Sequence, residues 1–179
     1  MEEIEVLIDE EEIGLKVREM AKAIACEHKD EKEIYFVTVL EGARRFSDDL
    51  VGEIMGLGGF KVKNYLVKVG SYGGGSESSG KIEVKKGLLE DVSGRELIIV
   101  EDIVDTGLTL SFFKEYLLTE KKARSVKICS FLDKPSRRKV DVNVDYVGYV
   151  VPDKFIVGYG LDYAGRYREL PYVGVVKTS

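Results

Sequence analysis

Apolar runs and helically spaced apolar residues alternate along this 179-residue chain. The runs at 34–40, 96–100 and 126–132 hold apolar, often β-branched residues at most positions, which is typical of strands buried on both faces of a parallel sheet. Outside the runs, apolar residues recur at helical intervals in three sets: Ile13, Val17, Met20, Ala21, Ile24 and Ala25; Ala43, Phe46, Leu50, Val51 and Ile54; and Leu110, Phe113, Leu117 and Leu118. The pattern predicts buried strands connected by amphipathic helices.

The segments before, between and after these elements carry weaker signals of secondary structure. Ile4–Ile8 predicts a short strand, and Asp9–Glu12 supplies a cap and first-turn acids for the first helix. Gly56–Gly59 ends the second helix, and Phe60–Val69 alternates apolar and polar residues as a half-exposed strand does. Asp145–Tyr149 and the last apolar stretch of the chain predict two further strands.

Composition and charge narrow the class of protein. The length suits one domain with a full core, and the net charge of −5 disfavours a general nucleic-acid or membrane-surface binder. Cys26 and Cys129 form no Cys-x-x-Cys pair, so we expect reduced, buried thiols in a cytoplasmic protein. We find no signal-peptide pattern and no apolar run of membrane-spanning length. The only histidine, His28, is expected to be a partly exposed residue at a helix end.

The strongest chemical signal lies where the second buried run leads into the third helix. Two acids, Glu101 and Asp102, are followed by a polar turn. The first N–H groups of a helix bind anions, Gly107 lets the backbone approach closely, and Thr106 and Thr109 add hydroxyl donors. The acids would repel a phosphate and suit a sugar diol or Mg²⁺ instead. The junction therefore predicts a ligand that carries both a phosphate and a ribose.

The whole string resembles the phosphoribosyl-pyrophosphate (PRPP) signature of the type I phosphoribosyltransferases. From Leu97 to Thr109 it reads four apolar residues, two acids, two apolar residues and Asp-Thr-Gly-x-Thr. This junction contains no Gly-x-Gly-x-x-Gly or Gly-x-x-x-x-Gly-Lys-Ser/Thr string, which argues against dinucleotide and P-loop ATP sites.

A second strand-to-helix junction follows the run at 34–40, and such junctions favour ligands at the carboxyl ends of strands. It resembles the pyrophosphate loop of the purine phosphoribosyltransferases, which commonly reads Leu-Lys-Gly and whose first peptide bond can be cis. Here Glu41 replaces the lysine. Gly42 and the backbone remain candidates for pyrophosphate binding, and Arg44 and Arg45 are candidates to replace the lost positive charge.

Residues 70–80 include five glycines and four serines. Such a composition is typical of a disordered linker, but a long loop within one domain is usually functional. The pair Ser71-Tyr72 at its front resembles the flexible catalytic loop of the hypoxanthine-guanine enzymes. We therefore expect a lid between the two strands of a hairpin.

Two later stretches specify the branch of the family. Lys134 and the basic run Arg137–Lys139 would by themselves be interpreted as solvated. The string Leu-Asp-Lys-Pro-Ser-Arg-Arg at 132–138 nevertheless resembles the bacterial hypoxanthine phosphoribosyltransferases at their base-binding lysine. The run Pro-Asp-Lys-Phe-x-Val-Gly-Tyr-x-Leu-Asp-Tyr at 152–163 is the most family-specific. With all motifs in the expected order, the chain is identified as a member of the bacterial hypoxanthine(-guanine) phosphoribosyltransferases.

The resemblance implies the α/β type I phosphoribosyltransferase fold as a single domain over residues 1–179. That fold has a mainly parallel central sheet with helices on both faces, in a core of about residues 30–150. A small hood would come from the N-terminal segment and from about residues 151–179, and a flexible lid loop would cover the site.

The resemblance also implies the residues of the site. PRPP would be held at its ribose and 5′-phosphate by Glu101, Asp102, Asp105, Thr106, Gly107, Leu108 and Thr109, and at its pyrophosphate by Glu41, Gly42 and Arg168. The purine base would contact Lys134, Phe155, Ile156 and Asp162, and Mg²⁺ would be held by Glu101, Asp102 and Asp162. The catalytic set would be Asp105, as the general base for the N7 proton, with Ser71 and Tyr72 on the lid.

The implied reaction joins N9 of hypoxanthine, or of guanine, to C1 of PRPP and gives IMP or GMP and pyrophosphate, in purine salvage with Mg²⁺. The implied enzyme is a cytoplasmic homodimer or homotetramer. One alternative is a transferase for xanthine or a pyrimidine, which the Lys134-to-hood pattern disfavours. The other is a non-catalytic, nucleotide-sensing RNA-binding regulator on the same fold, which the acidic charge and the intact lid disfavour.

Overall fold

The computed structural model describes residues 3–71, 82–86 and 92–177. Its main sheet has six strands in the order β4-β3-β2-β5-β6-β7, and every neighbouring pair is parallel except β3 with β4. The strands are β2 (Glu33–Val39), β3 (Lys61–Ser71), β4 (Ile82–Lys86), β5 (Glu96–Val104), β6 (Ser125–Asp133) and β7 (Tyr146–Val150). The mainly parallel sheet is confirmed.

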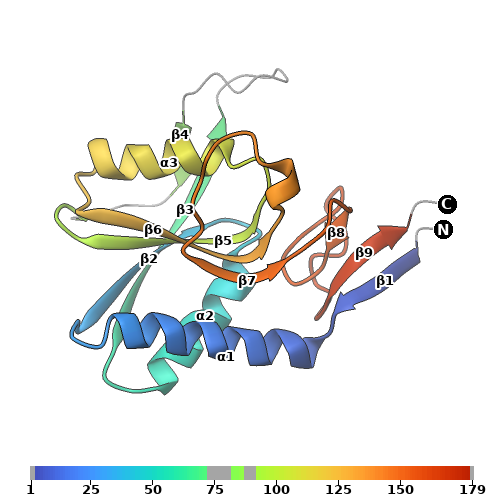
Figure 1. Cartoon of the computed structure of the whole chain (residues 1–179), viewed down its shortest axis with the longest axis horizontal. Helices are drawn as coiled ribbons and strands as arrows, with labels where there is room; N and C mark the ends of the chain where they lie inside the picture. The colour runs from blue at the N-terminus through green and yellow to red at the C-terminus, as the bar shows by residue number, and fades with distance from the viewer. Residues whose placement is uncertain (1–2, 72–81, 87–91, 178–179) are drawn as a thin grey trace.

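Helices cover both faces of this sheet, as Figure 1 shows. Helices α1 (Glu10–Glu27) and α2 (Arg44–Gly56) lie on one face, and α3 (Leu108–Thr119) lies on the other. The predicted apolar positions are the buried ones, except that Val51 is partly buried and Leu118 is exposed. It comes directly after the buried Leu117, at the edge of the buried stripe of α3, which Leu110 and Phe113 complete.

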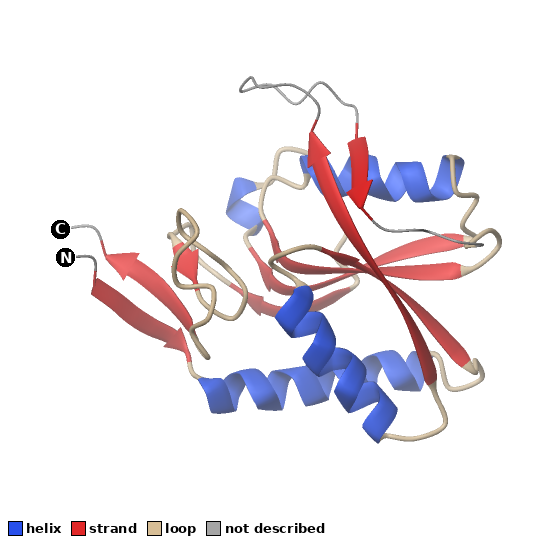
Figure 2. Cartoon of the chain, turned by 180° about the vertical axis from the view of Figure 1, so that it is seen from behind, coloured by secondary structure: helices blue, strands red, loops and turns tan. Residues whose placement is uncertain are grey.

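The two ends of the chain meet in a separate antiparallel sheet, the hood, in the order β1-β9-β8. Its strands are β1 (Glu3–Ile8), β8 (Ile156–Val157) and β9 (Val173–Lys177), and they stand at one end of the molecule (Figure 2). The Arg45 guanidinium donates to the Leu170 carbonyl at 3.1 Å, and the Tyr159 hydroxyl donates to Asp49 at 2.6 Å. Helix α2 therefore fastens the hood to the core.

Strand β5 extends past the predicted apolar run and includes both acids of the PRPP motif. The neighbouring β6 continues to Asp133, so Glu101 pairs with Ser130 and Val104 pairs with Asp133 in register. Because the backbone is fixed by this ladder, Glu101 and Asp102 project from a rigid strand end rather than from a loop.

Two predictions about single residues are wrong. His28 is buried rather than partly exposed: its Nε2 lies 2.6 Å from a carboxylate oxygen of Glu96, and its Nδ1 lies 2.8 Å from the Ile24 carbonyl oxygen. Cys26 is exposed rather than buried, because it lies on the outer side of α1, whereas Cys129 is buried in the sheet.

Strands β3 and β4 form the predicted hairpin. Ser71 is the last residue of β3, and Tyr72 with the rest of the expected lid lies outside the described residues. In the part of the chain that is described, no helix is both long enough and apolar enough to cross a membrane.

Candidate active site

The predicted site residues gather where the direction of the chain changes within the sheet. From β2 the chain passes through α2 to β3 on one side, and from β5 it passes through α3 to β6 on the other. The loops after β2 and β5 therefore diverge and leave a crevice at the carboxyl ends of adjacent strands, the usual ligand site of such sheets. The loop after β2 begins with a cis peptide bond between Leu40 and Glu41.

Two glycines bring the loop after β2 into contact with the acids and the hood. A Cβ placed on Gly42 would lie 1.8 Å from Oδ2 of Asp102. A Cβ placed on Gly160, in the hood, would lie 2.2 Å from the carbonyl oxygen of Gly42. The predicted pyrophosphate loop is thus packed between the PRPP motif and the hood, at distances that leave no room for a side chain.

Two acids, Glu101 and Asp102, stand side by side at the end of β5. Among the described residues, no ion pair involves Glu101 or Asp102, and their contacts include the Asp102 N–H, which donates to Glu101, and the Ile103 N–H, which donates to Asp102. Burial, and then repulsion by Asp102, raise the pKa of Glu101 well above its ordinary value, and burial raises the pKa of Asp102. Two such carboxylates attract a hydroxyl donor or a cation.

The loop that enters α3 is held by the basic run after β6. Gly107, the N-cap of α3, has a φ of 80°, which glycine adopts without strain. The Arg138 guanidinium donates to the Asp105 carbonyl at 2.8 Å, and the Lys139 N–H donates to the Thr106 carbonyl at 2.9 Å. Leu108 and Thr109 form the first turn of the helix, so the loop presents a fixed helix N-terminus.

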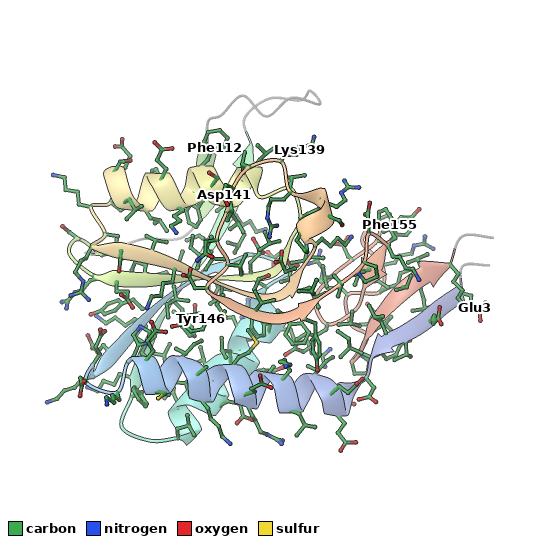
Figure 3. All side chains as sticks on the ribbon, viewed as in Figure 1. Glu3, Phe112, Lys139, Asp141, Tyr146 and Phe155 are labelled. Atoms are coloured by element: carbon green, nitrogen blue, oxygen red, sulfur yellow. The ribbon has the colours of Figure 1, made fainter. Side chains whose placement is uncertain are left out.

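A cavity of about 330 Å³ opens beside this loop, and we call it the base cavity. It is lined by Ile103, Asp105, Lys134, Arg137, Asp153, Lys154, Phe155, Ile156 and Leu161. Lys134 is buried rather than solvated, and its ammonium donates to the Lys154 carbonyl at 2.7 Å. Phe155 is 60% exposed and meets the edge of Tyr163 at a centroid distance of 4.9 Å; Figure 3 labels it on the hood.

The predicted pyrophosphate residues pair with partners that the sequence did not indicate. Glu41 accepts a hydrogen bond from Lys68 of β3 at 2.8 Å, and this bond lowers the pKa of the Glu41 carboxyl. Arg168 forms an ion pair with Asp162 at 2.6 Å. Asp162 also accepts the N–H of Gly165, so both of its oxygens have a donor.

The two arginines at the start of α2 each contact another group. Arg45 donates to hood carbonyl groups and stacks over Tyr159, while Arg44 lies 3.8 Å from Asp48. The cation that reaches Glu41 is Lys68 instead. No local signal pointed to it, because Lys68 is a polar position of a half-exposed strand, 27 residues after Glu41 in the sequence (68 − 41 = 27).

A larger hollow, of about 890 Å³, opens at the opposite edge of the sheet, where strands begin. It is lined by residues such as Tyr35, Arg95 and Arg124, and by none of the predicted site residues. Since ligands of parallel sheets bind at the carboxyl ends of strands, the base cavity and the crevice beside it remain the candidate active site.

Comparison with known proteins identifies the family. The model of the phosphoribosyl transferase domain matches residues 4–164. The hypoxanthine-guanine phosphoribosyltransferase of Bacillus subtilis is 47% identical over 178 residues, which cover 97% of this chain and 93% of that protein. The chain belongs to the hypoxanthine(-guanine) phosphoribosyltransferases.

Further members of this family match over the same length. The hypoxanthine phosphoribosyltransferase of Escherichia coli K12 is 40% identical and covers 97% of this chain and 95% of its own length. The crystal structure of a Bacillus anthracis hypoxanthine-guanine phosphoribosyltransferase superposes with a TM-score of 0.88 at 40% identity, covering 98% of this chain and 100% of that one. As a member of the family, the chain is a PRPP-dependent purine salvage transferase, and the comparisons lend no support to either alternative function.

Proposed function

We propose that this phosphoribosyltransferase makes IMP from hypoxanthine and GMP from guanine, with the base bound in the base cavity. One observation carries the proposal: a single cavity joins Asp105 from the end of β5, Lys134 from the end of β6, and Phe155 with Ile156 from the hood. These are the groups that an oxopurine needs, namely a proton acceptor, a donor, an apolar face and a backbone edge.

The base would be recognised mainly by its 6-oxo group. A lysine ammonium offers donors only, so Lys134 would pair with the oxygen of hypoxanthine or guanine and would face the amino group of adenine as donor against donor. Phe155 would stack on the base, and the Ile156 backbone would read its edge. Asp162, which lies in the hood, would also contact the base.

PRPP would lie along the crevice from the base cavity to the loop after β2. Its 5′-phosphate would sit on the turn formed by Asp105, Thr106, Gly107, Leu108 and Thr109, and its ribose hydroxyls would bind to Glu101 and Asp102. Its pyrophosphate would face Gly42 and Arg168. Glu41, paired with Lys68, would lie next to it as a neutralised acid.

The acid pair also fits Mg²⁺. This ion prefers carboxylate oxygens together with substrate phosphates and water. Glu101 and Asp102 are two adjacent carboxyl groups, and neither forms an ion pair within residues 3–71, 82–86 and 92–177. Asp162 would act through the water shell of the ion. When bound, Mg²⁺ would neutralise charge on the pyrophosphate leaving group. No group of three potential metal ligands occurs among the described residues.

The chemistry would be completed by Asp105 and by the lid. Asp105 would take the N7 proton from the purine while N9 bonds to C1 of the ribose. Ser71 and Tyr72 would exclude water from the cationic transition state. We further propose that the chain acts as one domain, in the cytoplasm, as a homodimer or homotetramer.

An assay of base, PRPP and Mg²⁺ across a panel of bases tests the function. Hypoxanthine should give IMP, guanine should give GMP, and EDTA should abolish turnover. No product with any oxopurine, or full turnover in EDTA, would refute the proposal.

The variant Lys134→Gln tests how the base is chosen. A hydrogen bond to a charged group is worth roughly 1.5–3 kcal/mol, so kcat/KM for hypoxanthine should fall by about 10-fold or more. The gap to adenine should narrow, because glutamine accepts as well as donates. Lys139→Gln, an exposed lysine of the next turn, is the matched control. An unchanged ratio of hypoxanthine to adenine would remove Lys134 from the base site.

A further inference from the structure

The basic run after Lys134 divides into two kinds of residue. Arg138 is largely buried, pairs with Asp133 at 2.5 Å and holds the Asp105 carbonyl, so it supports the backbone. Arg137, at the end of the short 3-10 helix η1 (Pro135–Arg137), has no such contact with the backbone of the loop among the described residues. Its side chain lines the base cavity instead.

The guanidinium of Arg137 lies between two carboxylates that both line that cavity. Its Nε donates to Oδ1 of Asp105 at 3.0 Å, and its Nη1 lies 3.6 Å from Oδ1 of Asp153. Asp105 belongs to the loop that enters α3, whereas Asp153 belongs to the hood. One cation therefore connects the core to the hood at the base cavity.

We propose that Arg137 is a positioning residue for the general base: it holds Asp105 by Oδ1 and so directs Oδ2 to the N7 proton of the purine. This inference rests on the proposed function, in which Asp105 is the base. A planar guanidinium fixes the orientation of a carboxylate better than a point charge does. Without it, the half-exposed Asp105 side chain would rotate among its rotamers.

The second carboxylate makes such a cation compatible with proton transfer. In the reaction the N7 proton passes to Oδ2 of Asp105 and the electrons of the N–H bond stay on the purine. N9 bonds to C1 of the ribose, and the electrons of the C1–O bond leave with pyrophosphate. Once Asp105 is neutral, Arg137 keeps Asp153 as its counter-ion. The proton transfer therefore does not leave an unpaired cation in the cavity.

Other charged groups lie around the Asp105 side chain. They are Lys134 at the end of β6, Lys154 on the hood loop and Arg138 against the Asp105 carbonyl, in addition to Arg137 and Asp153. Only Arg137 touches the Asp105 carboxylate among the described residues, so its removal should be the change that alters the pH dependence.

The test compares Arg137→Gln and Arg137→Lys with Arg124→Gln in the whole enzyme. Arg124 is an exposed arginine at the opposite edge of the sheet, 3.8 Å from Glu31, and serves as the matched control. Loss of a charge-assisted hydrogen bond should lower the kcat of Arg137→Gln about tenfold. In the same variant, the acidic limb of the profile of kcat against pH should move to higher pH, because the Asp105 carboxylate has lost its neighbouring cation. The KM for PRPP should stay within about twofold.

Arg137→Lys should keep the acidic limb near its wild-type position while kcat falls, since the charge remains and the planar geometry does not. An Arg137→Gln enzyme with wild-type kcat and pH profile would overturn the proposal. A lower kcat accompanied by a lower Tm and an unmoved acidic limb would also overturn it, because the role would then be structural. Absence of wild-type turnover would refute the proposed function itself, together with this role.

Discussion

The PRPP motif carries carboxylates in two contrasting environments. Glu101 and Asp102, at the end of β5, have raised pKa values because they are buried together, and no cation of the described chain pairs with them. Asp105, three residues further on, is half exposed and holds the guanidinium of Arg137. The acid pair therefore depends on a ligand for a cation or hydroxyl donor, whereas Asp105 already has a protein cation beside it.

This difference matches the tasks proposed for the two regions. Two adjacent, partly buried acids cost free energy until a ligand supplies a positive charge or hydroxyl donors, so in the proposed function their interactions are reserved for Mg²⁺ and ribose. A general base, by contrast, has to be ionised and oriented before the purine arrives. A protein cation at Asp105 meets that need, and one at Asp102 would compete with the metal.

The largest expected effect comes from removing the base itself. Asp105→Asn keeps the shape of the side chain but accepts no proton, so kcat should fall by about 10²–10⁴-fold. The KM for PRPP should change much less, because the 5′-phosphate is held mainly by backbone donors of the turn. Asp102→Asn should give the opposite pattern, with weaker binding of PRPP and Mg²⁺. If steady-state kinetics gave the same changes in kcat and in the KM for PRPP for both variants, the proposed difference between Asp105 and the acid pair would be contradicted.

A methyl group on Gly42 should disturb the acid pair and leave the base end intact. The added Cβ would overlap Oδ2 of Asp102 at 1.8 Å, and such overpacking costs about 1–3 kcal/mol. Gly42→Ala should therefore raise the KM for PRPP by at least about tenfold, while the KM for hypoxanthine, which binds in the base cavity, should change less. Gly52→Ala, in open space on α2, is the control and should stabilise the helix by about 0.5–1 kcal/mol. Equal kinetics for the two variants would refute the packing argument.

The acid pair should also give Mg²⁺ binding a pH dependence. Because both pKa values are raised in the folded protein, the folded state binds the protons of the pair more tightly than the unfolded state does. The resulting stabilisation is complete at a pH below the ordinary carboxyl range, and it is lost as the pH rises through the raised pKa values. In the proposed function Mg²⁺ binds the ionised pair, so it should restore that loss. Thermal unfolding should show an increase in Tm on adding Mg²⁺ that grows as the pH rises above the ordinary carboxyl range.

Glu101→Gln is the control for this measurement, since it removes one member of the pair. The variant should show a smaller and flatter response of Tm to Mg²⁺. A response in the wild type that is the same at every pH would mean that the acid pair does not hold the ion.

The smallest effect is expected at the Glu41–Lys68 pair. Lys68→Glu would place two acids beside the pyrophosphate, and because both side chains are partly exposed the KM for PRPP should rise only about two- to fivefold. The exchanged pair Glu41→Lys with Lys68→Glu should restore the wild-type value. An exchange of Glu5 and Lys177, a pair of similar exposure on the hood, is the control and should leave KM unchanged. Failure of the double exchange to restore KM would show that the pair does more than neutralise charge.

Local pattern determined a large part of this protein. Runs of β-branched residues predicted β2, β5 and β6, and helical spacing predicted α1, α2 and α3, because burial on one or both faces imposes these periods directly on the sequence. The string from Leu97 to Thr109 predicted a phosphate- and ribose-binding junction for the same reason: strand, turn and helix N-terminus are contiguous. The family was identified from motifs of this contiguous kind.

Pairings between distant segments were decided by the tertiary structure alone. His28 is buried because the end of α1 packs on β5 and meets Glu96, 68 residues away, which no local pattern records. The same holds for Lys68 at Glu41, for Asp102 against Gly42, and for Arg137 at Asp105. Periodicity specifies which face of an element is buried, but an isolated charge on a loop or strand end is specified only by what the fold brings next to it. The chemistry of each carboxylate in this site therefore followed from its neighbours in space.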